Sequence, residues 1–214
     1  MPAVPLVVLI ALLALPAAFA PLPAMATEEP GFELLEKAEP FELRRYAPMI
    51  VAETLVEGSL SEGSNAGFRL IAGYIFGKNQ SRTAGSSEKI AMTVPVTMQP
   101  GQKIAMTAPV TTGNIDGRWK MHFVMPAQYT MQTLPVPSDP RVSLREVAEQ
   151  RIAVKVFSGF VTEDRVRRET EELLAWMKTR NLEPAAAPQL ARYNPPWSIP
   201  FLRRNEILVQ YRHP

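Results

Sequence analysis

Residues 89–97 read Lys-Ile-Ala-Met-Thr-Val-Pro-Val-Thr, and residues 103–111 repeat this stretch with one change, Val94 to Ala108. Between the copies lies Gln99-Pro100-Gly101-Gln102, which has Pro and Gly at the central positions of a type II turn. Two β-rich runs joined by such a turn predict a β-hairpin. Ile and Met of each copy fall on one face and Ala, Thr and Pro on the other, as in a half-buried strand. Periodicity alone favours a structural ribbon whose Met residues fill the core.

The exact residue sequence of the repeat is more specific than its periodicity. It is similar to the Lys-Ile-x-Met-Thr-Ala-Pro-Val motif of the SOUL family of haem-binding proteins. Three more stretches resemble family landmarks in the same order: residues 119–126 a Trp-x-x-x-Phe-x-x-Pro strand, residues 134–142 a central linker, and residues 193–206 a C-terminal block. The resemblance runs from about Glu39 to Tyr211, nearly the whole chain after its first 26 residues.

Composition is that of an ordinary globular protein. The chain has 214 residues, of which 46% are hydrophobic and 21% charged, enough for one good core. A net charge of +2 without a basic stripe gives no argument for nucleic acid. Cysteine is absent, which excludes disulfides, a thiolate nucleophile and covalent haem attachment.

Residues 1–26 differ from the rest of the chain. The run from Val4 to Ala20 is apolar, is interrupted by two prolines, and is shorter than the roughly 20 residues of a membrane span. Ala24-Met25-Ala26 has the small-x-small form of a signal-peptidase site. We therefore expect a signal peptide over residues 1–26 and a periplasmic or secreted mature protein without a membrane span. The alternatives are an uncleaved membrane anchor through residues 4–20 and a misassigned start.

A second, weaker repeat divides the mature chain into halves. Residues 41–58 align with residues 142–159 without a gap, and Leu43, Ala52 and Gly58 meet Leu144, Ala153 and Gly159. A helical stretch, a strand that contains proline and a final strand follow each segment. Both halves, at about 33–126 and 141–213, therefore follow a β-β-α-β-β order.

The predicted fold is a single α+β domain over residues 27–214. Two β-β-α-β-β halves pack most simply as a pseudo-twofold distorted antiparallel β-barrel with two helices packed on it. The family resemblance implies the same fold.

The two predicted helices differ in character. The second begins after the N-cap Thr162 and has one apolar face, formed by Val166, Leu173, Leu174 and Met177. The first, over residues 64–76, is apolar nearly all round, and its only charge is Arg69. Since a helix on a sheet buries one stripe, either another part of the chain or an apolar ligand covers the remainder.

The resemblance implies non-covalent binding of haem or another tetrapyrrole in a shallow hydrophobic groove between the first helix and the loop before the last strand. Large apolar residues on that loop and guanidinium groups beside them suit an apolar disc that carries two propionates. The groove residues implied for this chain are Phe68, Arg69, Ala72, Phe76, Trp197, Phe201 and Arg203. The alternative is that Arg203 and Arg204 are structural and pair with carboxylates such as Glu206.

Histidine is scarce in this chain. His122 alternates with Trp119, Met121 and Phe123, so we expect it to face outward or to the rim. It is a candidate axial haem ligand, and the alternative is a surface or structural histidine. His213, next to the last residue, is a weaker candidate. The sequence shows no arrangement of residues typical of catalysis.

The leading interpretation is a non-catalytic protein that binds a small-molecule tetrapyrrole for haem trafficking, storage or buffering. One alternative is an effector-binding type of module for another flat apolar or cationic ligand. A second alternative is an enzyme that modifies a tetrapyrrole, with Glu206 or Tyr193 as the acid or base.

Overall fold

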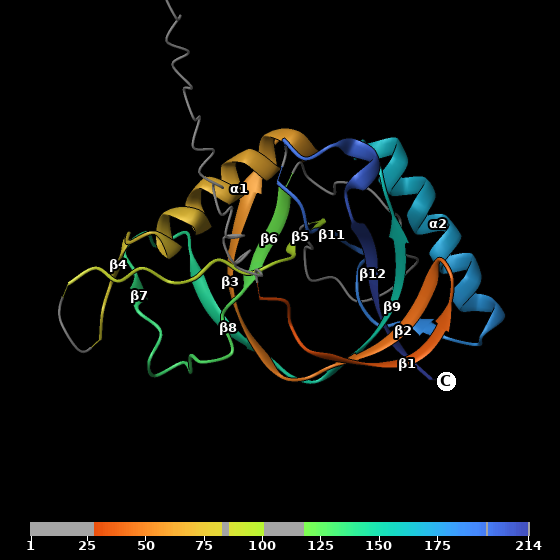
Figure 1. The fold of residues 1–214 in the computed structure, drawn as a ribbon, viewed down its shortest axis with the longest axis horizontal. Helices are drawn as coiled ribbons and strands as arrows, with labels where there is room; N and C mark the ends of the chain where they lie inside the picture. The colour runs from red at the N-terminus through yellow and green to blue at the C-terminus, as the bar shows by residue number, and fades with distance from the viewer. Residues whose placement is uncertain (1–27, 83–85, 101–117, 196, 214) are drawn as a thin grey trace, which may run out of the picture.

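The computed structural model describes residues 28–82, 86–100, 118–195 and 197–213 (Figure 1). The expected signal peptide and the second copy of the repeat, residues 103–111, lie outside the described residues.

The described residues form two long helices, one short helical turn and twelve strands. In chain order they are β1 (Phe32–Ala38), β2 (Phe41–Tyr46), β3 (Met49–Glu57), α1 (Leu60–Ile75), β4 (Asn79–Gln80), β5 (Val96–Pro100), β6 (Arg118–Val124), β7 (Val136–Pro137), β8 (Ser143–Val147), β9 (Gln150–Phe157), α2 (Glu163–Thr179), β10 (Glu183–Pro184), β11 (Gln189–Arg192), η1 (Pro200–Leu202) and β12 (Asn205–Arg212).

The order of strands in the main sheet is symmetric. It runs β1-β2-β9-β12-β11-β5-β6-β3-β8, and every pairing is antiparallel. Exchanging β2 with β8, β3 with β9, β5 with β11 and β6 with β12 reverses the order from β2 to β8 and leaves it otherwise unchanged. A pseudo-twofold axis therefore passes between β5 and β11, as two β-β-α-β-β halves require.

Strand register repeats the alignment of the two halves. Leu43 pairs with Ala153, and Leu144 pairs with Ala52. The glycines that follow β3 and β9, Gly58 and Gly159, both have positive φ, at 106° and 99°. Since residues other than glycine rarely adopt this backbone conformation, both halves use glycine to turn the chain from strand to helix.

The sheet is open among the described strands. Its edges are β1 and β8, and no closed barrel is found in the part of the chain that the structure describes. The α+β class with two helices on a large antiparallel sheet was predicted correctly. Both helices lie on one side of this sheet (Figure 1), and closure of the sheet into a barrel stays a prediction.

The first copy of the repeat does not form the predicted hairpin. Residues 89–95 contain no strand, only an isolated bridge from Thr93 to Glu28, and β5 begins at Val96. Both edges of β5 are taken, by β6 and β11, so its partner is not the second copy. The buried Thr93 hydroxyl donates to the carbonyl of Val124 instead, and Pro95 has no N–H to give to a ladder.

The two helices begin at well-formed caps. Ser59 caps α1 in a capping box with Glu62, so the helix begins at Leu60, four residues before the expected start at residue 64. Thr162 caps α2 as predicted. One core cluster joins the inner faces of both helices to the sheet. α1 lies very close to β6, because a Cβ atom on Gly67 would stand 2.8 Å from Sδ of Met121.

We expect Gly67→Leu to lower the free energy of unfolding by about 2–3 kcal/mol, because the new side chain has to displace Met121 from a filled core. Asn65→Leu introduces the same side chain on the exposed face of α1, and we expect a change within about 0.5 kcal/mol. Urea denaturation followed by circular dichroism measures both. Equal effects of the two variants would contradict this packing.

The other face of the sheet carries two smaller clusters, Tyr46 with Ile152 and Val154, and Val51 with Val124 and Val147. Met49 packs against both. Phe32 of β1 covers part of this face, with its ring 5.3 Å from that of Tyr46 and 4.4 Å from the guanidinium of Arg44.

Candidate functional site

The loop between β11 and β12 exposes a large apolar surface. Trp197 is 84% exposed and Phe201 72%, and Ile199, Leu202 and Phe160 are also exposed. We call these five residues the loop surface. The backbone N–H of Gly159 donates to the carbonyl of Pro200 at 3.0 Å, which brings Phe160 beside the loop. Exposed apolar groups on an ordered loop are typical of a binding surface.

Arg203 borders the loop surface. Its Nε donates to the carbonyl of Ser198 at 2.9 Å, and its guanidinium lies 5.5 Å from the ring centre of Phe160. Arg204 forms ion pairs with Glu206 and Glu29. The structural alternative therefore holds for Arg204, and contact of Arg203 with a ligand's carboxylate stays a prediction.

The helical part of the predicted groove is only partly exposed. Phe68 is 41% exposed, with its ring 5.7 Å from that of Phe123, and Phe76, the C-cap of α1, is 59% exposed. Ala72 is buried and offers little surface. Arg69 lines a recess of about 260 Å³ with Lys78 and four other residues: Ala66, Leu70, Asp139 and Arg141.

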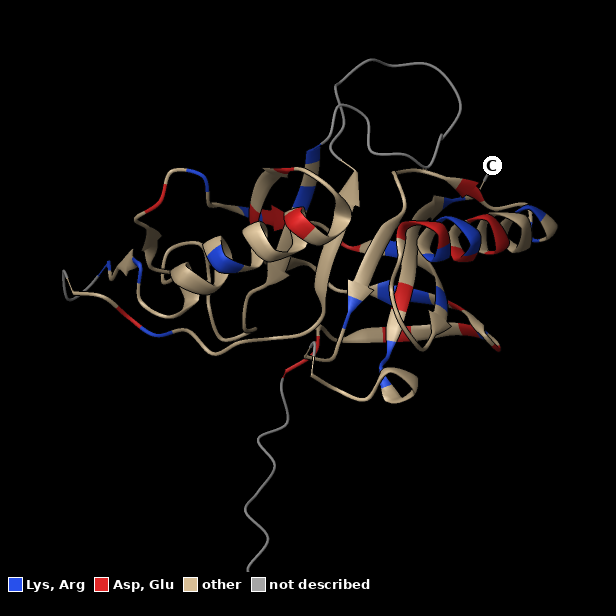
Figure 2. Ribbon diagram, turned by 90° about the horizontal axis from the view of Figure 1, so that it is seen from above, with Lys and Arg blue, Asp and Glu red and all other residues tan. Residues whose placement is uncertain are grey.

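The two walls of the predicted groove lie apart. Figure 2 shows η1 separated from α1 when the molecule is seen from above. In this view η1 is the short helical turn that is followed by Arg203 and Arg204 and then by β12. The loop is held to Gly159 by a hydrogen bond from the backbone N–H of that residue. Phe76 lies at the C-terminal end of α1, 16 residues and about 24 Å along the helix axis from Leu60 at its start. The seven residues thus form two apolar surfaces, and a single groove made of both stays a prediction.

His122 lies on the face of the sheet opposite α1. Met121 and Phe123, its neighbours in β6, belong to the core that also contains the inner face of α1. Successive side chains of a strand point to opposite faces, so the sheet separates His122 from Phe68. A haem bound on α1 would lie across the sheet from His122, and an axial role for His122 stays a prediction. His213 follows β12 at the exposed C-terminal end, with its ring against Tyr211.

The environment of His122 disfavours its charged form. Its Nδ1 is buried and has no hydrogen-bond partner among the described residues. Burial, together with the positive charges of Arg145 and Lys120, lowers the pKa of His122 to about 4.

This pKa predicts a dependence of stability on pH. Between pH 6.5 and 4 the unfolded chain binds more protons at His122 than the folded chain, so the free energy of unfolding falls as the pH drops through this window. His122→Asn should lose about 1.5 kcal/mol less than the wild type between pH 6.5 and pH 5. Urea titrations at the two pH values measure the difference, and His213→Asn is the control. Parallel losses in wild type and His122→Asn would contradict the shift.

A buried ion cluster lies at Glu206 on β12. The carboxylate is fully buried and accepts hydrogen bonds from Arg44 at 2.9 and 3.0 Å, from the Tyr193 hydroxyl at 2.6 Å and from Arg204 at 2.9 Å. Burial by itself would raise the pKa of Glu206, but Arg44, Tyr193 and Arg204 outweigh it and lower that pKa. Burial and the charge of Glu206 raise the pKa of Tyr193.

The sequence suggested only the pair of Arg204 with Glu206 and did not reveal the rest of this cluster. Arg44 and Glu206 are 162 residues apart, and no local pattern marks either as a partner. Their arrangement bears on the enzyme alternative, because Glu206 is occupied by three donors and Tyr193 is engaged with Glu206. Neither is placed to accept a proton from a substrate.

Arg44→Met should lower the free energy of unfolding by about 3–5 kcal/mol, because it leaves the carboxylate of Glu206 buried with incomplete compensation. Arg45→Met removes the same group from the next position of β2, where the partner Glu33 is exposed, and should cost less than about 1 kcal/mol. Denaturant titration compares them. A loss for Arg44→Met no larger than that for Arg45→Met would show that the cluster contributes little.

The described residues contain no group of three or more His, Cys, Asp or Glu side chains that could hold a metal ion. Among these residues, no helix is both long and apolar enough to cross a membrane.

Comparison with known proteins identifies the family of this chain. The family model described as SOUL heme-binding protein matches residues 27–210, and the chain therefore belongs to this family. No curated protein sequence is similar enough to count as a match.

Several solved structures share the fold. The crystal structure of the EcmrR C-terminal domain has a TM-score of 0.57 and 10% identity, over 81% of this chain and 98% of that one. A crystal structure of a hydrolase from Listeria innocua has a TM-score of 0.53 and 13% identity, over 80% of this chain and 91% of that one. At such low identity these likenesses concern the fold alone.

Proposed function

We propose that this protein binds haem or a related tetrapyrrole non-covalently and serves in haem trafficking, storage or buffering. The observation that carries this proposal is the match to the SOUL family over nearly the whole chain. The absence of cysteine supports a non-covalent mode, since thioether attachment of haem needs cysteine.

The loop surface supports the position of the ligand. Trp197 and Phe201 present aromatic groups to solvent, and the Arg203 guanidinium beside them suits a propionate. Phe68 and Arg69 on α1 form the second surface of the proposed site. Binding then rests on apolar contact rather than on one strong bond from iron to histidine.

Haemin titration, followed by the Soret band, tests this function. Binding should saturate near one equivalent. Trp197→Asp and Phe68→Asp should each weaken it by on the order of 10-fold or more, because each removes about 1.5–3 kcal/mol of apolar contact and adds a charge. Leu55→Asp, at an exposed apolar position on β3, is the matched control and should leave affinity unchanged.

The titration also separates the modes of binding. His122→Ala should leave haemin affinity within a few-fold of wild type. Loss of binding in His122→Ala alone would make His122 the axial ligand and overturn the proposed surfaces. Absence of any Soret shift in the wild type would contradict haem binding itself.

The proposed role includes export. The sequence Ala24-Met25-Ala26 supports removal of residues 1–26, which gives a mature protein that starts near Thr27 in the periplasm or outside the cell. Mass spectrometry of the protein recovered from these compartments should find this new terminus. A chain that keeps Met1 and fractionates with membranes would favour an anchor through residues 4–20.

A further inference from the structure

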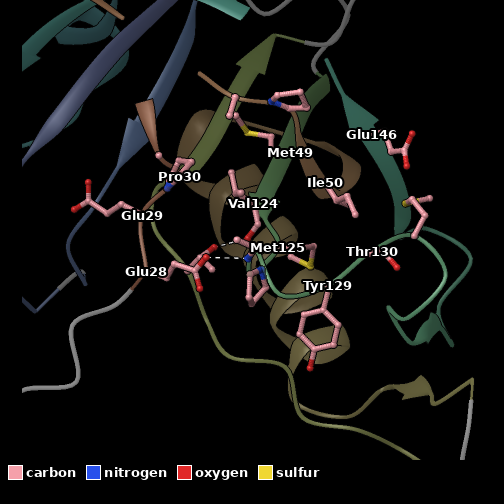
Figure 3. A pocket seen from close by; sticks show the side chains of 17 residues that line it. Glu28, Glu29, Pro30, Met49, Ile50, Val124, Met125, Tyr129, Thr130 and Glu146 are labelled. Atoms are coloured by element: carbon pink, nitrogen blue, oxygen red, sulfur yellow. Dashed lines mark hydrogen bonds between the residues drawn. The ribbon is translucent and has the colours of Figure 1, made fainter. Parts of the chain in front are cut away.

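A cavity of about 500 Å³ lies at the end of the sheet where β3 begins and β6 ends (Figure 3). Met49, Ile50, Val124 and Met125 give it an apolar wall, and Tyr129 adds an aromatic ring. Its volume is within the range of sites for small organic ligands.

All charged residues that line the cavity are negative. Glu28, Glu29 and Glu146 are among its 17 lining residues, and none of these residues is Lys, Arg or His. An apolar cavity of this kind favours a positive group on whatever it binds.

Two of the glutamates belong to an anchored wall. The carboxylate of Glu28 accepts a hydrogen bond from the Ala127 N–H at 2.8 Å, and the carbonyl of Glu28 accepts one from the Val94 N–H at 3.0 Å. Glu29 pairs with Arg204 at 3.1 Å. These contacts hold residues 28–31 across the sheet, so the cavity is built by the fold.

Glu146 supplies a negative charge at the cavity that no ion pair within the described part of the chain compensates. It is exposed on β8 and has no ion pair among the described residues, whereas its neighbour Arg145 pairs with Glu53. An accessible carboxylate at the rim of an apolar cavity can pair with a cation without the cost of burying the carboxylate completely.

Tyr129 is positioned by a contact outside the cavity. Its hydroxyl donates to Oε1 of Glu88 at 3.1 Å, and Glu88 is not a lining residue. Burial and Glu88 raise the pKa of Tyr129, so the phenol stays neutral. A neutral aromatic ring attracts an ammonium group through its π-electrons.

We propose that this cavity is a second ligand site, and that it takes a small organic cation with an apolar body, of the aryl quaternary ammonium class. The apolar wall receives the body of the ligand, while Tyr129 and Glu146 receive its charge. Haem does not suit this cavity, because its two propionates would meet the carboxylates of Glu28 and Glu146 and no cationic lining residue. The inference is therefore independent of the proposed haem function.

Isothermal titration with benzyltrimethylammonium tests the site, and phenylmethanesulfonate, which joins the same benzyl group to a negative charge, is the matched probe. The cation should bind near one equivalent and the anion should not compete. Glu146→Lys should weaken cation binding about 10-fold, since it reverses a charge at the rim. Glu171→Lys makes the same reversal on the exposed face of α2 and should leave affinity within about 2-fold.

The outcomes separate clearly. No heat of binding for the cation, equal binding of both probes, or equal effects of the two lysine variants would each overturn the proposal. Haemin should not displace the cation, and Glu146→Lys should leave haemin affinity unchanged. Displacement by haemin would place both ligands in one site and contradict a separate cation site.

Discussion

The buried carboxylate of Glu206 is the contact on which the rest of the structure depends. It joins β12 to β2 across β9 through Arg44, although the two residues are 162 positions apart. Taking these charges out of water is costly, and only the full set of donors offsets that cost. The cluster therefore imposes a strict geometry on the strands that carry it.

The same cluster positions both proposed ligand sites. Four of the five residues of the loop surface lie between Tyr193 and Arg204. Both of these residues bond to Glu206, so the loop is fixed at its two ends. Arg204 also reaches Glu29, which lines the cavity. One buried acid thus holds an exposed apolar loop beside Arg203 and the wall of a cavity lined by glutamates. The opposite charges of the two sites suit ligands of opposite charge.

The two halves share a topology and differ in how their helices pack. α1 uses Gly63 and Gly67 to approach β6, and its outer face carries exposed phenylalanines. α2 instead buries Glu169, which pairs with Lys155 of β9 and with Arg165. A duplicated scaffold therefore supports one helix that offers apolar surface and one that buries an ion pair against the sheet.

The sequence by itself determined the features that rest on local interactions. The family motif, the gap-free match of residues 41–58 to 142–159, the glycine turns and the cap at Thr162 all follow from residues close together in the chain. The alternation in β6 also placed His122 on the face opposite Met121 and Phe123. The apolar character of the loop before β12 was visible as well.

Only the tertiary structure decided which strands pair and which charges meet. The repeat at residues 89–97 reads as a strand, yet its first seven residues form none and both edges of β5 pair elsewhere, because sheet partners are chosen by long-range packing. The ion pair of Arg44 with Glu206 leaves no sequence pattern, since its partners meet only when β2 and β12 flank β9. The cavity is likewise assembled from five separate parts of the chain, at residues 28–31, 47–50, 93, 124–131 and 146, and no single part reveals it.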